Sequence, residues 1–231
     1  MGDGRYCWSD QGRTGVRILV TTRFDYIGLQ DFRRRVARIY AGVRDGRRDP
    51  ETRWQRFVRQ RDDLFARHPL SALDADQKAV FRGLPYFPYN PAYRFAAELE
   101  PVYDDEILEY DLGEDGHFSL KRFARAQLDI PGSGQSLSLY WVQGYGGGIF
   151  LPFRDQTNGR GTYGGGRYLL DTVKGADLGV EAGRHVLDFN FAYNPSCAYN
   201  PRWICPLAPE ENRLVFAVQS GEMEWRGFSQ T

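Results

Sequence analysis

The side chains most able to do chemistry lie in the second half of the chain, around residues 188–194. If this segment is a β-strand, Asp188, Asn190 and Asn194 share one face and the aromatic residues between them share the other. Polar groups enclosed by a sheet are costly unless they form a network or hold a ligand. The pattern therefore predicts a polar pocket if this face points inward, and a solvated surface if it points outward.

A pair of carboxylates could supply catalysis at the same place. Glu211 follows three prolines within nine residues, so its direction is fixed by a stiff backbone. Two acids in different environments can divide general-acid and general-base roles, which makes Asp188 and Glu211 the candidate catalytic residues of a hydrolase- or lyase-type enzyme. The alternative is a rigid corner in which Asn212 binds loop backbone. The residues leave open whether the protein is an enzyme.

A run of three glycines, Gly164–Gly166, lies between Arg154 and Arg167. Such a run suits a tight hairpin turn, or a loop that cradles a phosphate or carboxylate. The nucleotide-binding motifs do not apply, because the chain lacks the Gly-Lys-Ser/Thr ending of a P-loop. The binding residues that we expect around the pocket are Arg154, Asp155, Tyr163, Arg167, Asn190, Asn194 and Asn212.

The three cysteines are too few and too widely spaced for a disulfide framework or a zinc site. Cys197 and Cys205 have no neighbouring histidine and are expected to be small, half-buried residues beside a loop. Cys197 and His185 would form a nucleophile and base if they met in space, although no nucleophile-elbow motif accompanies them. No metal site is predicted, and no particular cofactor is indicated.

Three amphipathic helices are expected to form a layer over residues 30–83. The first follows Asp31 and ends at Asp45-Gly46. The second has Asp49 as N-cap and Pro50 in its first turn, and ends at His68-Pro69. We place Arg61 on its arginine-rich polar side. The third starts at Asp74 with Gln77 in a capping box and ends at Gly83.

The remaining residues, 84–231, show short β-rich runs separated by turn residues, which is typical of an antiparallel barrel or sandwich. We therefore predict an α+β fold in one domain, residues 1–231, with residues 1–29 as an N-terminal extension. Eight strands are expected, at Tyr93–Pro101, Ile107–Leu112, Phe118–Leu128, Ser136–Gln143, Gly148–Arg154, Arg167–Thr172, His185–Tyr193 and Arg213–Gly221.

Composition limits the classes of partner. The 231 residues carry 30 basic and 30 acidic side chains, so the basic excess of a general nucleic-acid binder is missing. No 18-residue apolar run or signal peptide is seen, and the odd cysteine count fits a reducing compartment, so we expect a soluble cytoplasmic protein without a membrane partner. Residues 1–70 carry 16 arginines and 9 acids, whereas residues 71–116 carry 11 acids and 3 bases. We expect these two segments to face each other.

Several long motifs together resemble the bacterial and archaeal family called domain of unknown function 1684. The resemblance covers residues 30–225 and implies no established activity. The motifs that carry it are the helix segment with Trp54, Arg61 and Asp62, the stop His68-Pro69-Leu70, the stretch Gly83–Tyr93, the run Tyr163-Gly-Gly-Gly-Arg-Tyr168, and the tail from Asp188-Phe189-Asn190 to Glu211-Asn212.

The residues favour a protein that binds a small polar or anionic molecule in a pocket lined by Asp, Asn and Arg. The paired-acid enzyme is one alternative. The second alternative is an oligomerising or scaffold protein, for which the aromatic stretch Tyr86–Tyr93 should form an exposed patch. The oligomeric state itself does not follow from the sequence.

Overall fold

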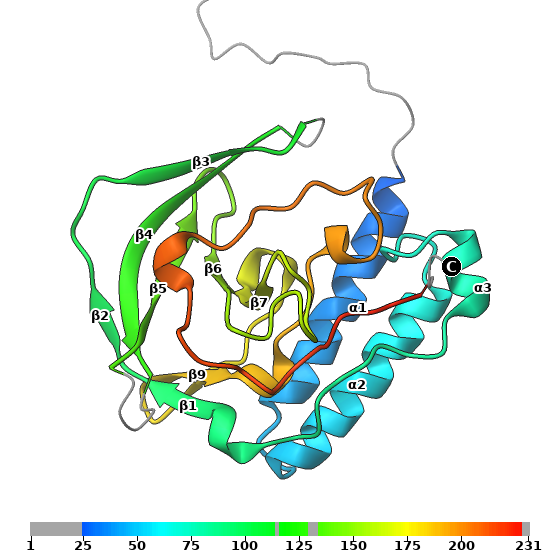
Figure 1. Cartoon of the computed structure of the whole chain (residues 1–231), viewed down its shortest axis with the longest axis horizontal. Helices are drawn as coiled ribbons and strands as arrows, with labels where there is room; N and C mark the ends of the chain where they lie inside the picture. The colour runs from blue at the N-terminus through cyan, green and yellow to red at the C-terminus, as the bar shows by residue number, and fades with distance from the viewer. Residues whose placement is uncertain (1–24, 114–115, 129–133, 228–231) are drawn as a thin grey trace, which may run out of the picture.

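Two long helices, α1 (Tyr26–Arg44) and α2 (Pro50–Arg67), lie side by side as one layer of the computed structural model, which describes residues 25–113, 116–128 and 134–227 (Figure 1). The second begins as predicted, because the Asp49 carboxylate accepts a hydrogen bond from the Thr52 backbone at 2.9 Å. It ends before Pro69. The short helix α3 (Ala75–Val80) has the predicted capping box between Asp74 and Gln77.

The first helix starts earlier than predicted. Asp25, not Asp31, caps it, by accepting a hydrogen bond from the Gly28 backbone at 2.8 Å. The acid at position 31 instead pairs with Arg35 one turn further on, at 2.8 Å. The proposed N-terminal extension, residues 1–29, therefore includes the first turn of α1, and its residues 1–24 lie outside the described residues.

The strands form two antiparallel sheets beside the helices (Figure 1). The larger sheet has the order β2-β4-β5-β6-β7, with β3 also paired to β4, and the smaller has the order β1-β9-β8. The strands are β1 (Arg94–Ala97), β2 (Leu99–Pro101), β3 (Ile107–Asp111), β4 (His117–Gln127), β5 (Ser136–Val142), β6 (Ile149–Phe153), β7 (Arg167–Asp171), β8 (Val180–Glu181) and β9 (Arg184–Asp188).

This arrangement confirms the α+β class. The larger sheet ends at β2 and β7, and these two strands do not pair, so the described residues form no closed barrel. Short 3-10 helices connect the later elements: η1 (Pro91–Tyr93), η3 (Thr172–Lys174), η4 (Phe189–Phe191), η5 (Ser196–Ala198) and η6 (Glu210–Asn212).

Three predicted strands differ from the structure, and β8 was not predicted. The first, Tyr93–Pro101, is divided into β1 and β2, because its two halves pair with different strands, β9 and β4, in different sheets. The seventh stops at Asp188, whose carboxylate accepts a hydrogen bond from the Asn190 backbone at 3.0 Å and so starts η4. The eighth, Arg213–Gly221, forms no strand, although Arg213 makes an isolated bridge to Arg154. Part of its backbone is bound by buried side chains instead, since the Val218 N–H donates to Asp155 at 3.1 Å.

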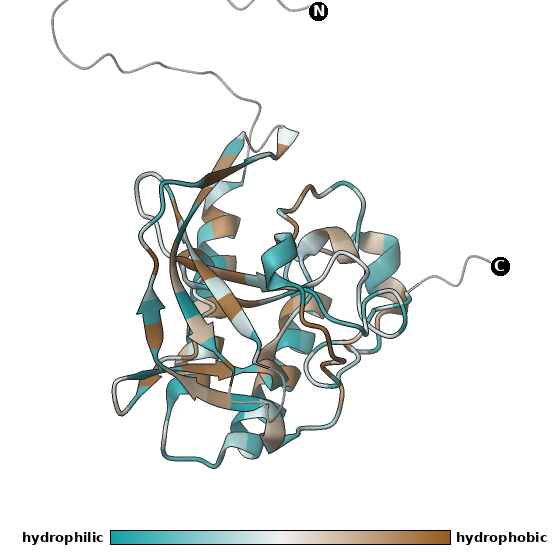
Figure 2. Ribbon diagram, turned by 60° about the vertical axis from the view of Figure 1, so that its left-hand side comes forward, coloured by the Kyte–Doolittle hydropathy of each residue, from teal (hydrophilic) through white to brown (hydrophobic). Residues whose placement is uncertain are grey.

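One hydrophobic core is shared by the helices and both sheets. Ile39 of α1 and Phe57 of α2 belong to the same cluster as Leu139 of β5, Leu151 of β6 and Leu187 of β9. Figure 2 shows hydrophobic residues on the helices as well as on the strands. Burial of this shared apolar surface is the main force that holds the helical layer on the sheets.

The arginine-rich and acidic segments do lie against each other, since α3 and Tyr86 pack on α2, but the charge pairing behind this prediction does not occur among the described residues. No ion pair there joins an arginine of residues 25–70 to an acid of residues 71–116. The acids Asp104 and Glu106 pair instead with Arg122 of β4, and Asp105 pairs with Lys121. Lys121 and Arg122 of β4 lie beside the loop that holds these acids, so the acids pair with them and not with the helices.

Within the part of the chain that the structure describes, no helix combines the length and the apolar character needed to cross a membrane.

Candidate functional site

Two of the predicted site residues, Asp155 and Arg167, form a fully buried ion pair. Their side chains lie 2.8 Å apart and are not exposed to solvent. The guanidinium of Arg167 also donates to the backbone carbonyls of Val218, at 3.0 Å, and Ser220, while the Asp155 carboxylate accepts from Thr157. This pair therefore binds the backbone of the segment that was expected to be the last strand.

Asp188 and Asn190 belong to a second polar cluster, next to β1. The amide of Asn190 donates to the Asp188 carboxylate at 2.7 Å, and its oxygen accepts from the Asn90 backbone at 2.8 Å and from Ser220 at 2.7 Å. Both residues are 1% exposed, which excludes the solvated-surface alternative for this face. Burial raises the pKa of Asp188 to about 6, against the opposing hydrogen bonds from Asn190 and the charge of Arg94.

Glu211 lies in a third cluster. Its carboxylate accepts a hydrogen bond from Tyr140 of β5 at 2.5 Å and pairs with Arg122 at 3.4 Å. Among the described residues Glu211 and Asp188 share no partner, and the charged neighbour of Asp188 is Arg94 in the smaller sheet. The two candidate catalytic acids are therefore held by different sheets and are not brought together as a pair.

Asn212 forms the rigid corner that we gave as the alternative to a catalytic site. The Asn212 side chain is buried, accepts from the Ser138 backbone at 2.7 Å, and donates to the carbonyls of Ser138 at 2.9 Å and Pro152 at 2.7 Å. It thus joins η6 to strands β5 and β6. Such a network fixes the backbone around it.

The glycine run forms a turn. Gly166 has φ +93°, and a Cβ atom there would lie 2.6 Å from the Phe153 carbonyl oxygen, so this position requires glycine. The Arg154 guanidinium donates to the Gly164 carbonyl at 2.9 Å, and Arg167 points into the interior. Tyr163 extends from this turn toward Cys197, its hydroxyl 3.5 Å from the sulfur. Cys197 has this tyrosine, not His185, as its neighbour.

A further buried ion pair, between Arg61 of α2 and Glu222, is the strongest polar feature that sequence reasoning missed. The guanidinium donates to the carboxylate at 2.8 Å, the Asn194 backbone donates to the same oxygen at 3.1 Å, and Tyr199 donates to the other oxygen. Burial raises the pKa of Glu222, and Arg61 and Tyr199 oppose that shift. We call these four residues the Arg61–Glu222 centre.

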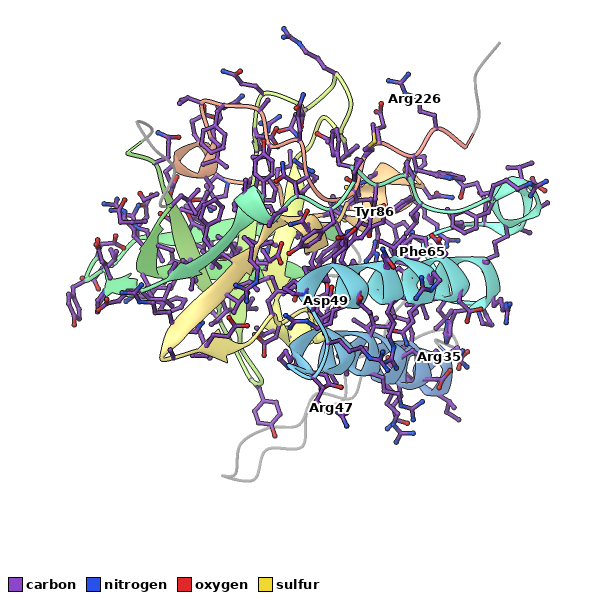
Figure 3. All side chains as sticks on the ribbon, turned by 90° about the horizontal axis from the view of Figure 1, so that it is seen from below. Arg35, Arg47, Asp49, Phe65, Tyr86 and Arg226 are labelled. Atoms are coloured by element: carbon purple, nitrogen blue, oxygen red, sulfur yellow. The ribbon has the colours of Figure 1, made fainter. Side chains whose placement is uncertain are left out.

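Several polar atoms around this centre have no partner among the described residues. They are the hydroxyls of Tyr40 and Tyr86, the Nε of Arg61 and the Oδ1 of Asn194. Burial raises the pKa of both tyrosines, so their hydroxyls stay protonated at neutral pH. In Figure 3, Tyr86 lies over α2 on its inner side, whereas Arg35 and Arg47 lie on the outer side of the helical layer.

The spacing of the apolar residues indicates that Arg61 is buried, although we placed it on the polar side of the helix. Arg61 is four residues after Phe57 and four before Phe65, and this spacing puts it on the apolar face of α2. Its guanidinium lies 5.6 Å and 5.2 Å from the centroids of those two rings, and 5.2 Å from that of Tyr193. An arginine on an apolar helix face needs a buried carboxylate, and Glu222 supplies it.

The aromatic stretch that would mark a scaffold protein packs inward. Tyr86 and Tyr89 contact Trp54 of α2, with ring centroids 6.3 Å and 6.0 Å apart. The Tyr93 hydroxyl donates to the Ala217 carbonyl at 3.2 Å. The tyrosine rings of this stretch are therefore half-buried, whereas Pro88, Pro91 and Ala92 are exposed.

An open pocket lies elsewhere, between the first half of α1 and η3, and we call it the α1–η3 groove. Its volume is about 490 Å³. Among its lining residues are Arg33 and Arg34 of α1 and Lys174 of η3. Gly175 ends η3 with φ +88° and lies against Ala37, so that the two elements meet at one side of the groove.

The charges in this groove are unbalanced. Lys174 pairs with Asp171 at 3.0 Å, but neither Arg33 nor Arg34 has an ion-pair or hydrogen-bond partner among the described residues. Both arginines are exposed. No group of three or more potential metal ligands occurs in the described part of the chain.

Comparison with known proteins gives a family and a fold. An uncharacterized protein of Haloarcula marismortui, solved by solution NMR, is 33% identical, with a TM-score of 0.53 over 75% of this chain and 93% of that one. No curated protein matches the chain. The model of the family described as protein of unknown function DUF1684 matches residues 79–223. This match confirms the resemblance seen in the motifs: the chain belongs to the DUF1684 family.

Proposed function

We propose that the protein binds a small anionic molecule in the α1–η3 groove. The observation that carries this proposal is a pair of arginines, Arg33 and Arg34, on the wall of a pocket of about 490 Å³, neither of which has a partner within the part of the chain that the structure describes. Pockets for small molecules commonly have volumes of about 300–1,000 Å³, so the size is suitable.

The chemistry of the lining supports an oxygen-rich anion such as a phosphate or a carboxylate. A guanidinium offers two parallel N–H donors to such a group. Lys174 adds a third positive charge, which Asp171 balances, so the two arginine charges remain for the ligand. Leu29, Ala37 and Val173 supply apolar surface in the same groove for the rest of the ligand.

The two other functions have less support. Asp188 and Glu211 bind different partners in different sheets, so no observation favours a paired-acid hydrolase or lyase. The rings of Tyr86 and Tyr89 pack on Trp54, which removes the main argument for an oligomerising scaffold.

The first prediction concerns binding of pyrophosphate, a probe with the expected charge, measured by isothermal titration calorimetry. We expect the double variant Arg33→Ser/Arg34→Ser to raise Kd at least about tenfold, because a hydrogen bond to a charged group is worth about 1.5–3 kcal/mol. Kd of the unchanged protein should also rise with salt, since the groove is open to solvent.

Arg59→Ser is the matched control for this experiment. Arg59 is likewise exposed and unpartnered among the described residues, but it lies on α2 and does not line the groove. The control should bind pyrophosphate as the unchanged protein does. Equal loss of binding in the control and the double variant would mean that the groove is not the site. Absence of binding to pyrophosphate, citrate and a nucleoside monophosphate alike would also contradict the proposal.

A further inference from the structure

Two of the cysteines lie together in the described structure, although eight positions separate them. Cys197 is in η5, and its backbone N–H donates to the sulfur of Cys205 at 3.4 Å. Adding the N–Cα bond of about 1.46 Å places that sulfur within about 4.9 Å of the Cys197 Cα atom. The two side chains also hydrogen-bond to each other, so the sulfur of Cys205 lies beside the residue with which it would form a disulfide.

The two thiols have different environments. Cys197 receives hydrogen bonds from Cys205 and from the Tyr163 hydroxyl, the latter at 3.5 Å, and together these lower the pKa of Cys197 to about 6 against the effect of burial. The pKa of Cys205 is raised, by its contact with Cys197 and by burial. The pair therefore favours a thiolate at Cys197, which the Tyr163 hydroxyl and the Cys205 thiol both stabilise.

The segment that carries the two cysteines is fixed by a hydrogen bond and a proline, and both cysteines are partly exposed to solvent. The Tyr168 hydroxyl donates to the Pro206 carbonyl at 2.6 Å, next to Cys205, and Pro195 comes just before η5. Both cysteines are partly exposed. The pair is therefore not fully enclosed by the protein.

We propose that Cys197 and Cys205 form a reversible, peroxide-oxidised dithiol, in which Cys197 is the nucleophile and Cys205 the resolving thiol. The Cys197 thiolate attacks one oxygen of a hydroperoxide, whose O–O bond breaks; the sulfur becomes a sulfenic acid, and the departing oxygen takes a proton and leaves as alcohol or water. The Cys205 thiol then attacks the Cys197 sulfur, forming the S–S bond and releasing water. Two electrons pass from the two sulfurs to the hydroperoxide.

This site is separate from the groove proposed above, and it lies within the residues that match the family. Loss of anion binding in the groove would therefore leave it unaffected. The third cysteine, Cys7, lies outside the described residues, so the experiment uses the full chain with Cys7→Ser.

The second prediction is tested by treating this protein with one equivalent of hydrogen peroxide and digesting it with trypsin without reduction. Cleavage at Arg202 separates the peptide 185–202, with Cys197, from the peptide 203–213, with Cys205. Mass spectrometry should show the two peptides joined, two hydrogens lighter than their sum, and dithiothreitol should release them. Two separate peptides, unmodified or with Cys197 over-oxidised to sulfinic acid, would overturn the proposal.

Variants assign the two roles. In Cys205→Ser the sulfenic acid should persist at Cys197 and react with dimedone; labelling at neither position would contradict the assignment. Tyr163→Phe should slow alkylation of Cys197 by iodoacetamide at pH 6 about fivefold, if the lost hydrogen bond accounts for about one pKa unit. Tyr110→Phe is the matched control, because its hydroxyl donates to Leu207, near the pair, without touching either sulfur. An equal effect in both variants, or none in Tyr163→Phe, would show that the hydroxyl does not activate Cys197.

Discussion

At the scale of single residues, the site residues predicted from the sequence form ion pairs and hydrogen bonds with one another. Asp155 and Arg167 neutralise each other, and Asn190 uses its amide to join Asp188 to Asn90. Residue type leaves two alternatives for the face with Asp188 and Asn190, a buried network or a solvated surface, because the pattern does not show which way the face points. It does not identify the partners, which come from segments up to 100 positions away.

Asp188 carries the third prediction, which concerns pH. Its pKa in the folded protein is about 6, well above that of an exposed aspartate, so the folded state holds the proton more tightly than the unfolded state does. The stability that this proton supplies is present below pH 4 and is lost as the pH rises through 6. Replacing Asp188 by Asn should therefore stabilise the protein more at pH 7.5 than at pH 4, by about 3 kcal/mol.

Urea unfolding of both proteins at pH 4, 5, 6 and 7.5 measures this difference. Asp104→Asn serves as a control of opposite sign, because the hydrogen bond from Arg122 lowers the pKa of Asp104. Removing that acid should cost stability at pH 4 and above, and two added measurements at pH 3 and 2.5 should show the cost shrinking as Asp104 takes up a proton. If the difference between Asp188→Asn and the unchanged protein were the same at every pH, Asp188 would not be a buried carboxyl with a raised pKa.

At the scale of elements, local signals explain what could be predicted. The bounds of α2 follow from Asp49, Pro50 and Pro69, all of which act within one turn of the helix ends. The strand ending at Asp188 was predicted too long because alternation was followed through a turn that Asp188 itself caps. Segment 213–221 was mistaken for a strand because the groups that bind its backbone, Asp155 and Arg167, are distant in sequence.

The fourth prediction concerns the buried ion pair that joins Arg61 of α2 to Glu222 in the C-terminal segment. Arg61→Met should destabilise the protein by about 3–5 kcal/mol, because it leaves the Glu222 carboxylate buried without its cation. Arg59→Met, on the exposed side of the same helix, should change the free energy of unfolding by less than about 0.5 kcal/mol. Guanidinium unfolding followed by circular dichroism measures both.

A double variant separates loss of the charge pair from loss of packing around Arg61. Glu222→Gln in the Arg61→Met background removes the uncompensated charge, so the double variant should recover part of the loss. A double variant as unstable as the sum of the two single variants would mean that the pair does not couple α2 to the C-terminal segment.

At the scale of the whole molecule, the helical layer and the sheets share one core, so the proposal of a single domain has a direct consequence. Phe57 of α2 and Leu139 of β5 belong to one hydrophobic cluster, and the Trp54 indole donates to the Asn190 carbonyl at 3.1 Å. Neither layer can expose its inner face without exposing that of the other. Proteins built in this way usually unfold in one cooperative step.

The fifth prediction is therefore that the slowest-exchanging amides of α2 and of β5 open with the same free energy. Native-state hydrogen exchange at increasing urea concentrations, read by mass spectrometry on peptides from each element, measures it. Equal free energies and equal slopes against urea are expected, because both report the same global unfolding. A lower free energy and a smaller slope for α2 would mean that the helical layer separates from the sheets before they unfold. In that case the α1–η3 groove, which the two layers build together, would open independently of the core, and anion binding would stabilise only the junction between the layers.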